Sequence, residues 1–256
     1  MEAFQRAMCD LVASPDLCLA LVQSPEEVLG RYDLSDRDRR RLVEVVQQPG
    51  MLVNCSLYRA NRLSPIYNLV PHTCFLLGDA LLAEATEFWK GFKETRLQFH
   101  DEVKQFGDFL RRRVELGVLQ NPMLVEVLEY ELALNEFRYT PRVEVLARLE
   151  LNRTVANESK RVQLHPLIRV LLFRHEPRRL LEFLDERVPP PYDLAEGEFW
   201  LLLDGKGEEV EIKLIDPGVG RLLKAIDVET ALSLSADDVE VLLEAGLTVL
   251  QPSDAP

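Results

Sequence analysis

The stretch FWLLLDGKGEEVEIKLI, residues 199–215, decides the fold of this chain. Its first five residues form an apolar run of strand length, and residues 204–207 have the composition of a tight turn. In residues 209–215 apolar and charged side chains alternate, so one face of this segment is apolar and the other is polar. The stretch therefore predicts a β-hairpin whose second strand is antiparallel and half-buried.

Helices and a last strand are expected after this hairpin. Asp216 and Pro217 have the pattern of a helix cap followed by proline in the first turn. Another helix is expected over residues 235–245, and residues 247–250 are expected to form a closing strand. A hairpin followed by helices and a final strand is the order of a winged-helix-like domain.

The first 150 residues are expected to form helices. Their apolar residues recur with about the 3.6-residue period of an amphipathic helix. The segments with this pattern are residues 35–46, 51–70, 79–92, 103–114 and 121–137. Mixed, polar residues 138–160 are interpreted as linker, residues 162–173 as a strand, and Pro177 as the start of a helix. The predicted fold class is α+β and mainly helical, with a helical bundle domain over residues 1–150 and a winged-helix-like domain over residues 151–256.

Charge is distributed unevenly along the chain. The formal net charge is −13, and residues 180–256 hold 18 acidic and 5 basic side chains, so the whole excess lies in this last part. A DNA-binding winged helix needs lysine and arginine on its recognition helix and wing. An acidic domain repels phosphate backbones and attracts basic segments. We therefore expect no nucleic-acid partner and favour a peptide partner.

The cysteine pattern and the hydropathy indicate a cytoplasmic protein. Cys9, Cys18, Cys55 and Cys74 form no C-x-x-C pair, which favours buried, reduced thiols over a zinc site. No uninterrupted apolar segment reaches the length of a membrane span, and the first residues lack the pattern of a secretory signal. We expect no membrane association, no metal site and no cofactor bound by this chain.

Glu131 is the first candidate for a catalytic residue. It shares a helix face with Leu124, Leu128 and Asn135, and a carboxylate on an apolar stripe needs a partner. A structural ion pair with Arg59 or Arg62 is favoured over a catalytic role. His100-Asp101-Glu102 is interpreted as a polar loop rather than as a group of acid–base catalysts. With both candidates interpreted in this way, we expect no catalytic residue in this chain.

Several short motifs, in order, resemble a known family. They are LYRANR at residues 57–62, LGD at 77–79, FGDFL at 106–110, LEYELAL at 128–134 and LHPLIR at 164–169. Together they are similar to the family of partner proteins that includes HvfC and BufC, named for a DNA-binding domain, with MbnC and TglI as more distant relatives. The resemblance covers roughly residues 55–250.

The resemblance implies a partner protein in the biosynthesis of ribosomally made, modified peptides. In that family a separate multinuclear non-heme iron TIM-barrel enzyme modifies cysteine in a precursor peptide, and the partner protein binds the leader of the precursor. Carried over to this chain, the leader would pair with the edge of the second hairpin strand and lie against a neighbouring helix. Its peptide-binding residues would be Glu209, Val210, Glu211, Ile212, Lys213, Leu214 and Ile215, with Glu209 and Glu211 facing basic side chains of the peptide.

The same resemblance implies that Tyr58, Arg59, Asn61 and Arg62 are structural or face the enzyme. It also implies that the iron is bound by the partner enzyme. The lead-in at residues 55–57 and the acidic C-terminal region leave the subfamily open, with a preference for the TglI-like group. Two other functions remain as alternatives: a DNA-binding transcription regulator, and a stand-alone enzyme that uses Glu131 and His100.

Overall fold

The computed structural model describes residues 2–91, 99–154, 160–227 and 236–252. The chain forms two compact units, Met1–Asn68 and Leu69–Pro256, called here the N-terminal unit and the C-terminal unit. Helices dominate both, and the strands form small antiparallel sheets in the C-terminal unit. The predicted α+β, mainly helical class is confirmed at this level.

The described part of the N-terminal unit is helical. Its helices are α1 (Glu2–Ala13), α2 (Pro15–Gln23), α3 (Pro25–Leu29), α4 (Asp36–Val46) and most of α5 (Pro49–Leu69). Ser14 Oγ accepts the Leu17 N–H at the start of α2, and Ser35 Oγ accepts the Asp38 N–H at the predicted start of α4, both at 3.2 Å. These caps satisfy N–H groups that have no partner inside the helix. The apolar faces of these helices meet in one core that includes Leu11, Leu21, Leu42, Met51 and Cys55.

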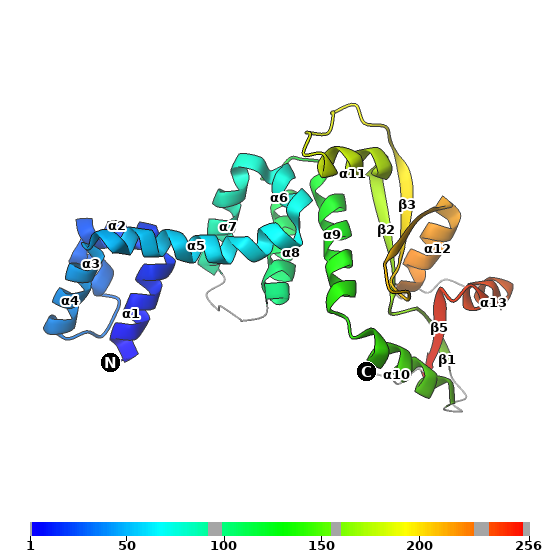
Figure 1. Ribbon diagram of the computed structural model, residues 1–256, viewed down its shortest axis with the longest axis horizontal. Coiled ribbons are helices and arrows are strands. Elements are labelled where there is room, and N and C mark those ends of the chain that lie inside the picture. Colours follow the sequence, from blue (N-terminus) through cyan, green and yellow to red (C-terminus); the bar gives the residue numbers. More distant parts are fainter. Residues whose placement is uncertain (1, 92–98, 155–159, 228–235, 253–256) are drawn as a thin grey trace. The chain divides into compact units, whose positions relative to one another are not determined.

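The C-terminal unit combines helices with five short strands among its described residues (Figure 1). Its first helices are α6 (Pro71–Leu77), the 3-10 turn η1 (Gly78–Ala80), α7 (Leu81–Gly91), α8 (Phe99–Glu115), α9 (Leu124–Tyr139) and α10 (Arg142–Thr154). Then follow β1 (Lys160–Leu164), β2 (Ile168–His175), α11 (Pro177–Asp185), β3 (Glu196–Asp204), β4 (Glu211–Ile215), α12 (Pro217–Asp227), α13 (Ala236–Glu244) and β5 (Thr248–Pro252).

The strands form two antiparallel sheets, one of β1 and β5 and one in the order β2-β3-β4. Helices cover both faces of the three-stranded sheet, and Figure 1 shows α9 and α12 flanking β2 and β3 on opposite sides. Leu201 and Leu203 of β3 pack with α9 and α11, whereas Trp200 and Leu202 pack with α12. Successive side chains of β3 point to opposite faces, and helices cover both faces. Every position of this part of β3 is therefore apolar.

The predicted hairpin is present, and it joins β3 to β4 with Leu201 opposite Leu214 and Leu203 opposite Ile212. Its second strand is more exposed than expected: Ile212 is 44% and Leu214 is 61% exposed. The expected strand over 162–173 is divided at His165-Pro166-Leu167 into β1 and β2, which belong to different sheets.

The division of the chain differs from the predicted boundary at residues 150/151. Helices α6 to α9 belong to the same compact unit as the sheet, because Val127 and Phe137 of α9 share a core with the β3 leucines. The expected linker contains helix α10, and His100 to Glu102 lie in the first turn of α8 rather than in a loop. Charge composition marked the acidic region but not the limits of the core.

Three of the four cysteines are buried. Cys18, Cys55 and Cys74 are buried free thiols as predicted, whereas Cys9 is exposed. Ser235, the first residue of the helix expected over residues 235–245, lies outside the described residues. Among the described residues no single helix is long and apolar enough to cross a membrane; only the consecutive helices Pro49–Leu69 and Pro71–Gly91, taken together, meet that test by length and composition.

Candidate functional site

Strand β4 forms an edge of the three-stranded sheet. Among the described strands it pairs with β3 alone, so the backbone groups along its other side have no strand partner. Side chains alternate along a strand, so Ile212 and Leu214 share one face, and Glu211, Lys213 and Ile215 share the other. An edge strand with exposed apolar residues is a template for a further strand.

A groove runs between β4 and α11. Its volume is about 480 Å³. The residues that line it are Glu176, Pro177, Arg178, Leu181, Glu182, Asp185, Leu201, Ile212 and Leu214. Leu201 belongs to the buried core, and Leu181 packs at the margin of that core. The groove therefore has an apolar floor that continues into the core and a rim of charged residues.

Helix α11 lies beside β4 because its own apolar stripe is buried. Leu180 and Leu184, four residues apart, have no exposed surface and pack in the core beneath β3. Glu176 caps the helix by accepting the N–H groups of Arg178 and Arg179 at 3.3 and 2.8 Å. Burial of this stripe leaves the neighbouring stripe, which carries Leu181, facing the groove.

The charged residues of the groove come from α11, not from the β4 hairpin. Glu211 forms an ion pair with Lys213 at 2.6 Å, on the face of β4 opposite to Ile212 and Leu214. Glu209 precedes β4 and does not line the groove. The predicted peptide contacts of Glu209 and Glu211 therefore lie outside this groove, and the acidic residues of α11 that line it, Glu182 and Asp185, were not predicted as site residues.

The last residues of β2, the opposite edge strand of the sheet, are bonded to a side chain of α9. Glu126, which is 6% exposed, accepts the N–H groups of Arg174 and His175 at 2.6 and 3.4 Å. Its other oxygen lies 2.6 Å from His175 Nδ1. Burial raises the pKa of Glu126, although these hydrogen bonds oppose the shift. The carboxylate thus takes the place of a strand partner at this end of β2.

The loop of the hairpin is also held by its neighbours. Arg142, at the start of α10, donates from Nη1 to the carbonyl oxygens of Gly207 and Glu208, the second at 2.8 Å. A side chain at Gly205 would meet the ring of Phe137, with its Cβ 2.6 Å from Phe137 Cδ1. The β3–β4 hairpin is therefore fixed to α9 and α10, and its outer edge stays accessible.

Glu131 has a structural partner of a different kind from the predicted arginine. Its two oxygens accept the N–H groups of His72 and Thr73, at 2.7 and 2.8 Å, in the first turn of α6. The side chain is 4% exposed, and burial raises its pKa to about 7 against the effect of these hydrogen bonds. Glu131 therefore caps α6, where a helix N-terminus favours a negative charge.

The residues of the family-like motif lie in the other compact unit. Tyr58, Arg59, Asn61 and Arg62 are on α5, where the guanidinium of Arg62 lies 6.0 Å from the centre of the Tyr58 ring. Asn61 is exposed. The structure thus places this group and the β4 edge in separate units, while β4 and Glu131 lie in the same one.

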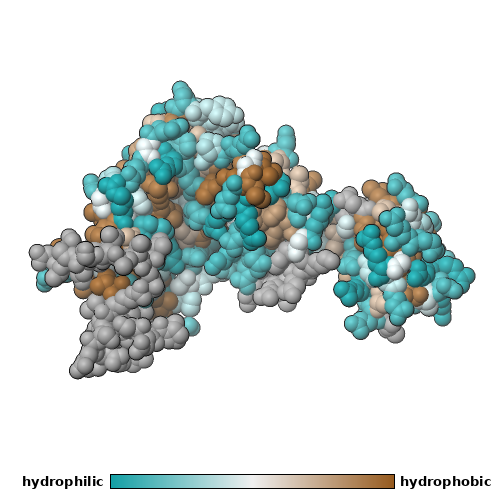
Figure 2. All heavy atoms as spheres, turned by 180° about the vertical axis from the view of Figure 1, so that it is seen from behind, coloured by the Kyte–Doolittle hydropathy of each residue, from teal (hydrophilic) through white to brown (hydrophobic). Residues whose placement is uncertain are grey.

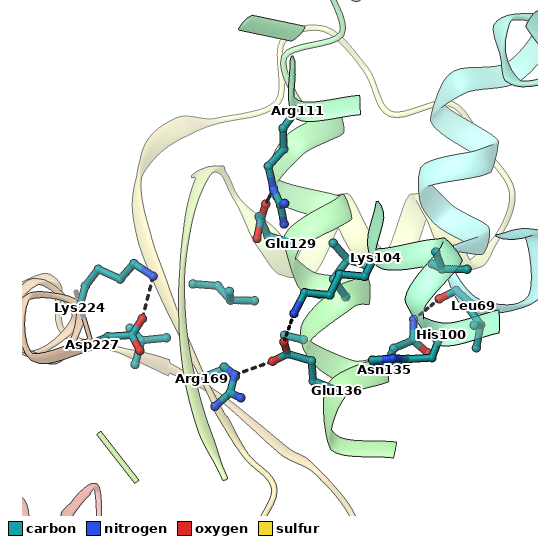
Figure 3. Close-up of a pocket in the computed structure, with 15 residues that line it drawn as sticks. Leu69, His100, Lys104, Arg111, Glu129, Asn135, Glu136, Arg169, Lys224 and Asp227 are labelled. Atoms are coloured by element: carbon teal, nitrogen blue, oxygen red, sulfur yellow. Dashed lines mark hydrogen bonds and ion pairs between the residues drawn. The ribbon is translucent and has the colours of Figure 1, made fainter. Parts of the chain in front are cut away.

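A second hollow, of about 140 Å³, lies between α8, α9, β2 and α12 (Figure 3). Figure 3 shows Glu136 directed towards Arg169 and Lys104, at 2.8 and 4.0 Å, and Lys224 towards Asp227, at 3.0 Å. Arg111 also pairs with Glu129. Because opposite charges alternate around this hollow, it presents no concentration of one charge to a ligand.

Metal-ligating residues do not cluster in the described part of the chain: no three His, Cys, Asp or Glu side chains there could hold a metal ion together.

Figure 2 shows hydrophobic residues reaching one face of the protein in patches separated by hydrophilic ones. The groove beside β4 combines an apolar floor, a charged rim and a strand edge without a strand partner among the described residues.

No protein-family model matches the chain, and no curated protein matches it.

Proposed function

We propose that this protein is a non-catalytic partner subunit that binds the leader of a ribosomally made precursor peptide. The leader adds as a strand to the free edge of β4 and is presented to a multinuclear non-heme iron TIM-barrel enzyme that modifies cysteine. The single observation that carries the proposal is the open β4 edge beside the groove with α11. Strand addition with a helix as an apolar wall is a recurring mode of peptide recognition.

The contrast between the two sheet edges supports this choice. Natural proteins usually protect exposed edges, and Glu126 does so at β2. At β4 the chain instead exposes Ile212 and Leu214 next to a groove. Backbone hydrogen bonds of an added strand would supply affinity, and the alternate side chains that enter the groove would supply specificity.

A winged-helix-like role of the sheet is part of the proposed function. In it, β2, β3 and β4 with the adjacent helices act as a winged-helix-like recognition element for the leader. Tyr58, Arg59, Asn61 and Arg62 are structural or face the enzyme, and the iron belongs to that enzyme. The TglI-like group is the preferred subfamily.

A substitution on the groove face of β4 tests the proposal. The protein is co-expressed with an iron TIM-barrel enzyme encoded beside its gene, and the complex is run on size exclusion with a synthetic leader from a neighbouring short, cysteine-containing open reading frame. We expect a stable complex that retains the leader. Leu214→Glu should weaken leader binding at least about ten-fold, because it places a charge in the apolar groove.

Lys213→Glu is the matched control. It introduces the same carboxylate one position away, on the opposite face of β4, and should leave leader binding within about three-fold of the wild type. A monomer that binds neither the enzyme nor the leader would overturn the proposal. Equal weakening by both substitutions would show that the groove face is not the binding face.

A further inference from the structure

The charges along α11 form a stripe over the groove. Arg178, Leu181, Glu182 and Asp185 all line it, and their spacings of three, four and seven residues place them on one face of the helix. From Arg178, Glu182 lies about 6 Å and Asp185 about 10 Å further along the helix axis. The positive end of the stripe is therefore near the start of α11, and the negative part is near its end.

The first two charges of this stripe are unpaired. Within the described residues the side chains of Arg178 and Glu182 form no hydrogen bond or ion pair, although they are four residues apart on one helix. Glu176 also lines the groove, but its carboxylate is engaged in capping α11. Glu182 thus offers an unneutralised carboxylate directly beside the apolar floor.

Asp185 extends the negative part of the stripe. Its carboxylate lies 3.2 Å from His72 Nε2, and its side chain is 72% exposed. Burial lowers the pKa of His72, so the ring is mainly neutral near pH 7 and does not form a full ion pair with Asp185. Asp185 and Glu182 together form an acidic rim, one helical turn long, over the exposed Ile212 and Leu214.

We propose that this groove selects an extended cationic peptide segment: aliphatic side chains at alternate positions contact Leu181, Leu201, Ile212 and Leu214, and a lysine or arginine pairs with Glu182 and Asp185. This inference rests on the proposed peptide-binding function and names the class of peptide. The long stem of lysine or arginine covers apolar surface while its charged end reaches the rim. The 18 acidic and 5 basic residues of positions 180–256 attract such a segment over longer distances.

Arg178 limits where the cation lies. Near the start of α11 the charge of Arg178 is offset by that of Glu176, whereas near its end Glu182 and Asp185 are both negative. A basic residue of the peptide is therefore attracted most strongly near the end of α11, so one orientation of the peptide is favoured. Charge patterns of this kind contribute to specificity and to the rate of association more than to affinity. Glu182 and Asp185 are therefore specificity-determining residues of the site.

The test selects peptides from a phage-displayed random library with the full-length wild-type protein, Leu214→Glu, Glu182→Lys and Arg178→Glu. Glu182 and Arg178 are exposed, so neither substitution should disturb the fold. The wild type should enrich sequences with alternating aliphatic residues and a lysine or arginine, and Leu214→Glu should enrich none of them. One enriched peptide is then synthesised with its cation kept, or replaced by glutamate, and titrated by fluorescence anisotropy.

The cationic peptide should bind Glu182→Lys about ten-fold more weakly than the wild type, and the glutamate peptide should recover part of that loss. Arg178→Glu should bind the cationic peptide at least as tightly as the wild type. Enrichment that depends on Leu214 but not on a cation would overturn this inference and leave the peptide-binding proposal standing. No enrichment that depends on Leu214 would overturn both.

Discussion

At the scale of single residues, buried carboxylates act here as substitutes for missing backbone partners. Glu131 accepts two N–H groups at the start of α6, and Glu126 accepts two along the edge of β2. Both residues lie on α9, so one helix completes the hydrogen bonding of two other elements. The position of Glu131 on an apolar helix face indicates that its carboxylate needs a partner. An arginine partner can be read in the sequence, whereas a backbone N–H donor cannot.

Glu131 should make stability depend on pH near neutrality. Its pKa is about 7 in the folded protein against 4.5 for an ordinary glutamate, so the folded state holds the proton more tightly. The resulting stabilisation is fully present below about pH 4.5 and is lost as pH rises through about 7, by at most about 3 kcal/mol.

Urea denaturation of the wild type and of Glu131→Gln from about pH 5 to about pH 8 measures this effect. We expect the wild type to lose stability relative to the variant over that range, because glutamine stays neutral. Other titrating groups are common to both proteins and cancel in the difference. A stability difference between the wild type and Glu131→Gln that does not change with pH would contradict the raised pKa of Glu131.

At the scale of elements, the periodicity of the sequence predicts most helices and strands. It predicts less well how exposed the faces of these elements are. Residues 209–215 alternate as a half-buried strand should, yet Ile212 and Leu214 face a groove. Alternation reports which residues share a face, whereas the distance to the neighbouring helix decides whether that face is covered. A neighbouring helix was expected beside this strand, but the sequence did not identify it as α11 for the same reason: Leu180, Leu181 and Leu184 look alike in sequence, and only Leu181 lines the groove.

The packing of α12 on the sheet depends on a glycine. A Cβ at Gly220 would lie 2.2 Å from Cγ of Trp200, which is 4% exposed. Gly220→Ala should therefore destabilise the protein by about 1–3 kcal/mol, even though alanine is the better helix former by up to about 1 kcal/mol. Chemical denaturation, followed by the fluorescence of the tryptophans, measures the change.

Gly91 in α7 provides the control for that substitution within the same compact unit. A Cβ there has no atom within 4 Å, so Gly91→Ala should leave stability unchanged or raise it by up to about 1 kcal/mol. A neutral Gly220→Ala would mean that α12 does not pack closely on Trp200.

At the scale of the whole molecule, the predicted boundary at residues 150/151 lies in the polar segment before the acidic region, whereas the structure divides the chain at Asn68 and Leu69. The acidic excess begins near residue 180, but the core under the sheet includes Val127 and Phe137 of α9. Charge resides on the surface and need not follow the limits of a core, so composition alone could not locate the division at Asn68 and Leu69.

Two fragments distinguish these boundaries. Residues 69–256 contain α9, both sheets and the groove, and should unfold cooperatively on their own and retain peptide binding. Residues 151–256 lack the α9 side of the core and the Glu126 carboxylate at the β2 edge, so the buried faces of β2 and β3 would be exposed to water at a cost of several kcal/mol. Circular dichroism during urea denaturation should show a sigmoidal transition for the longer fragment and a gradual one for the shorter. A cooperative transition in residues 151–256 would mean that the acidic region is a domain in its own right, with α9 an accessory to it.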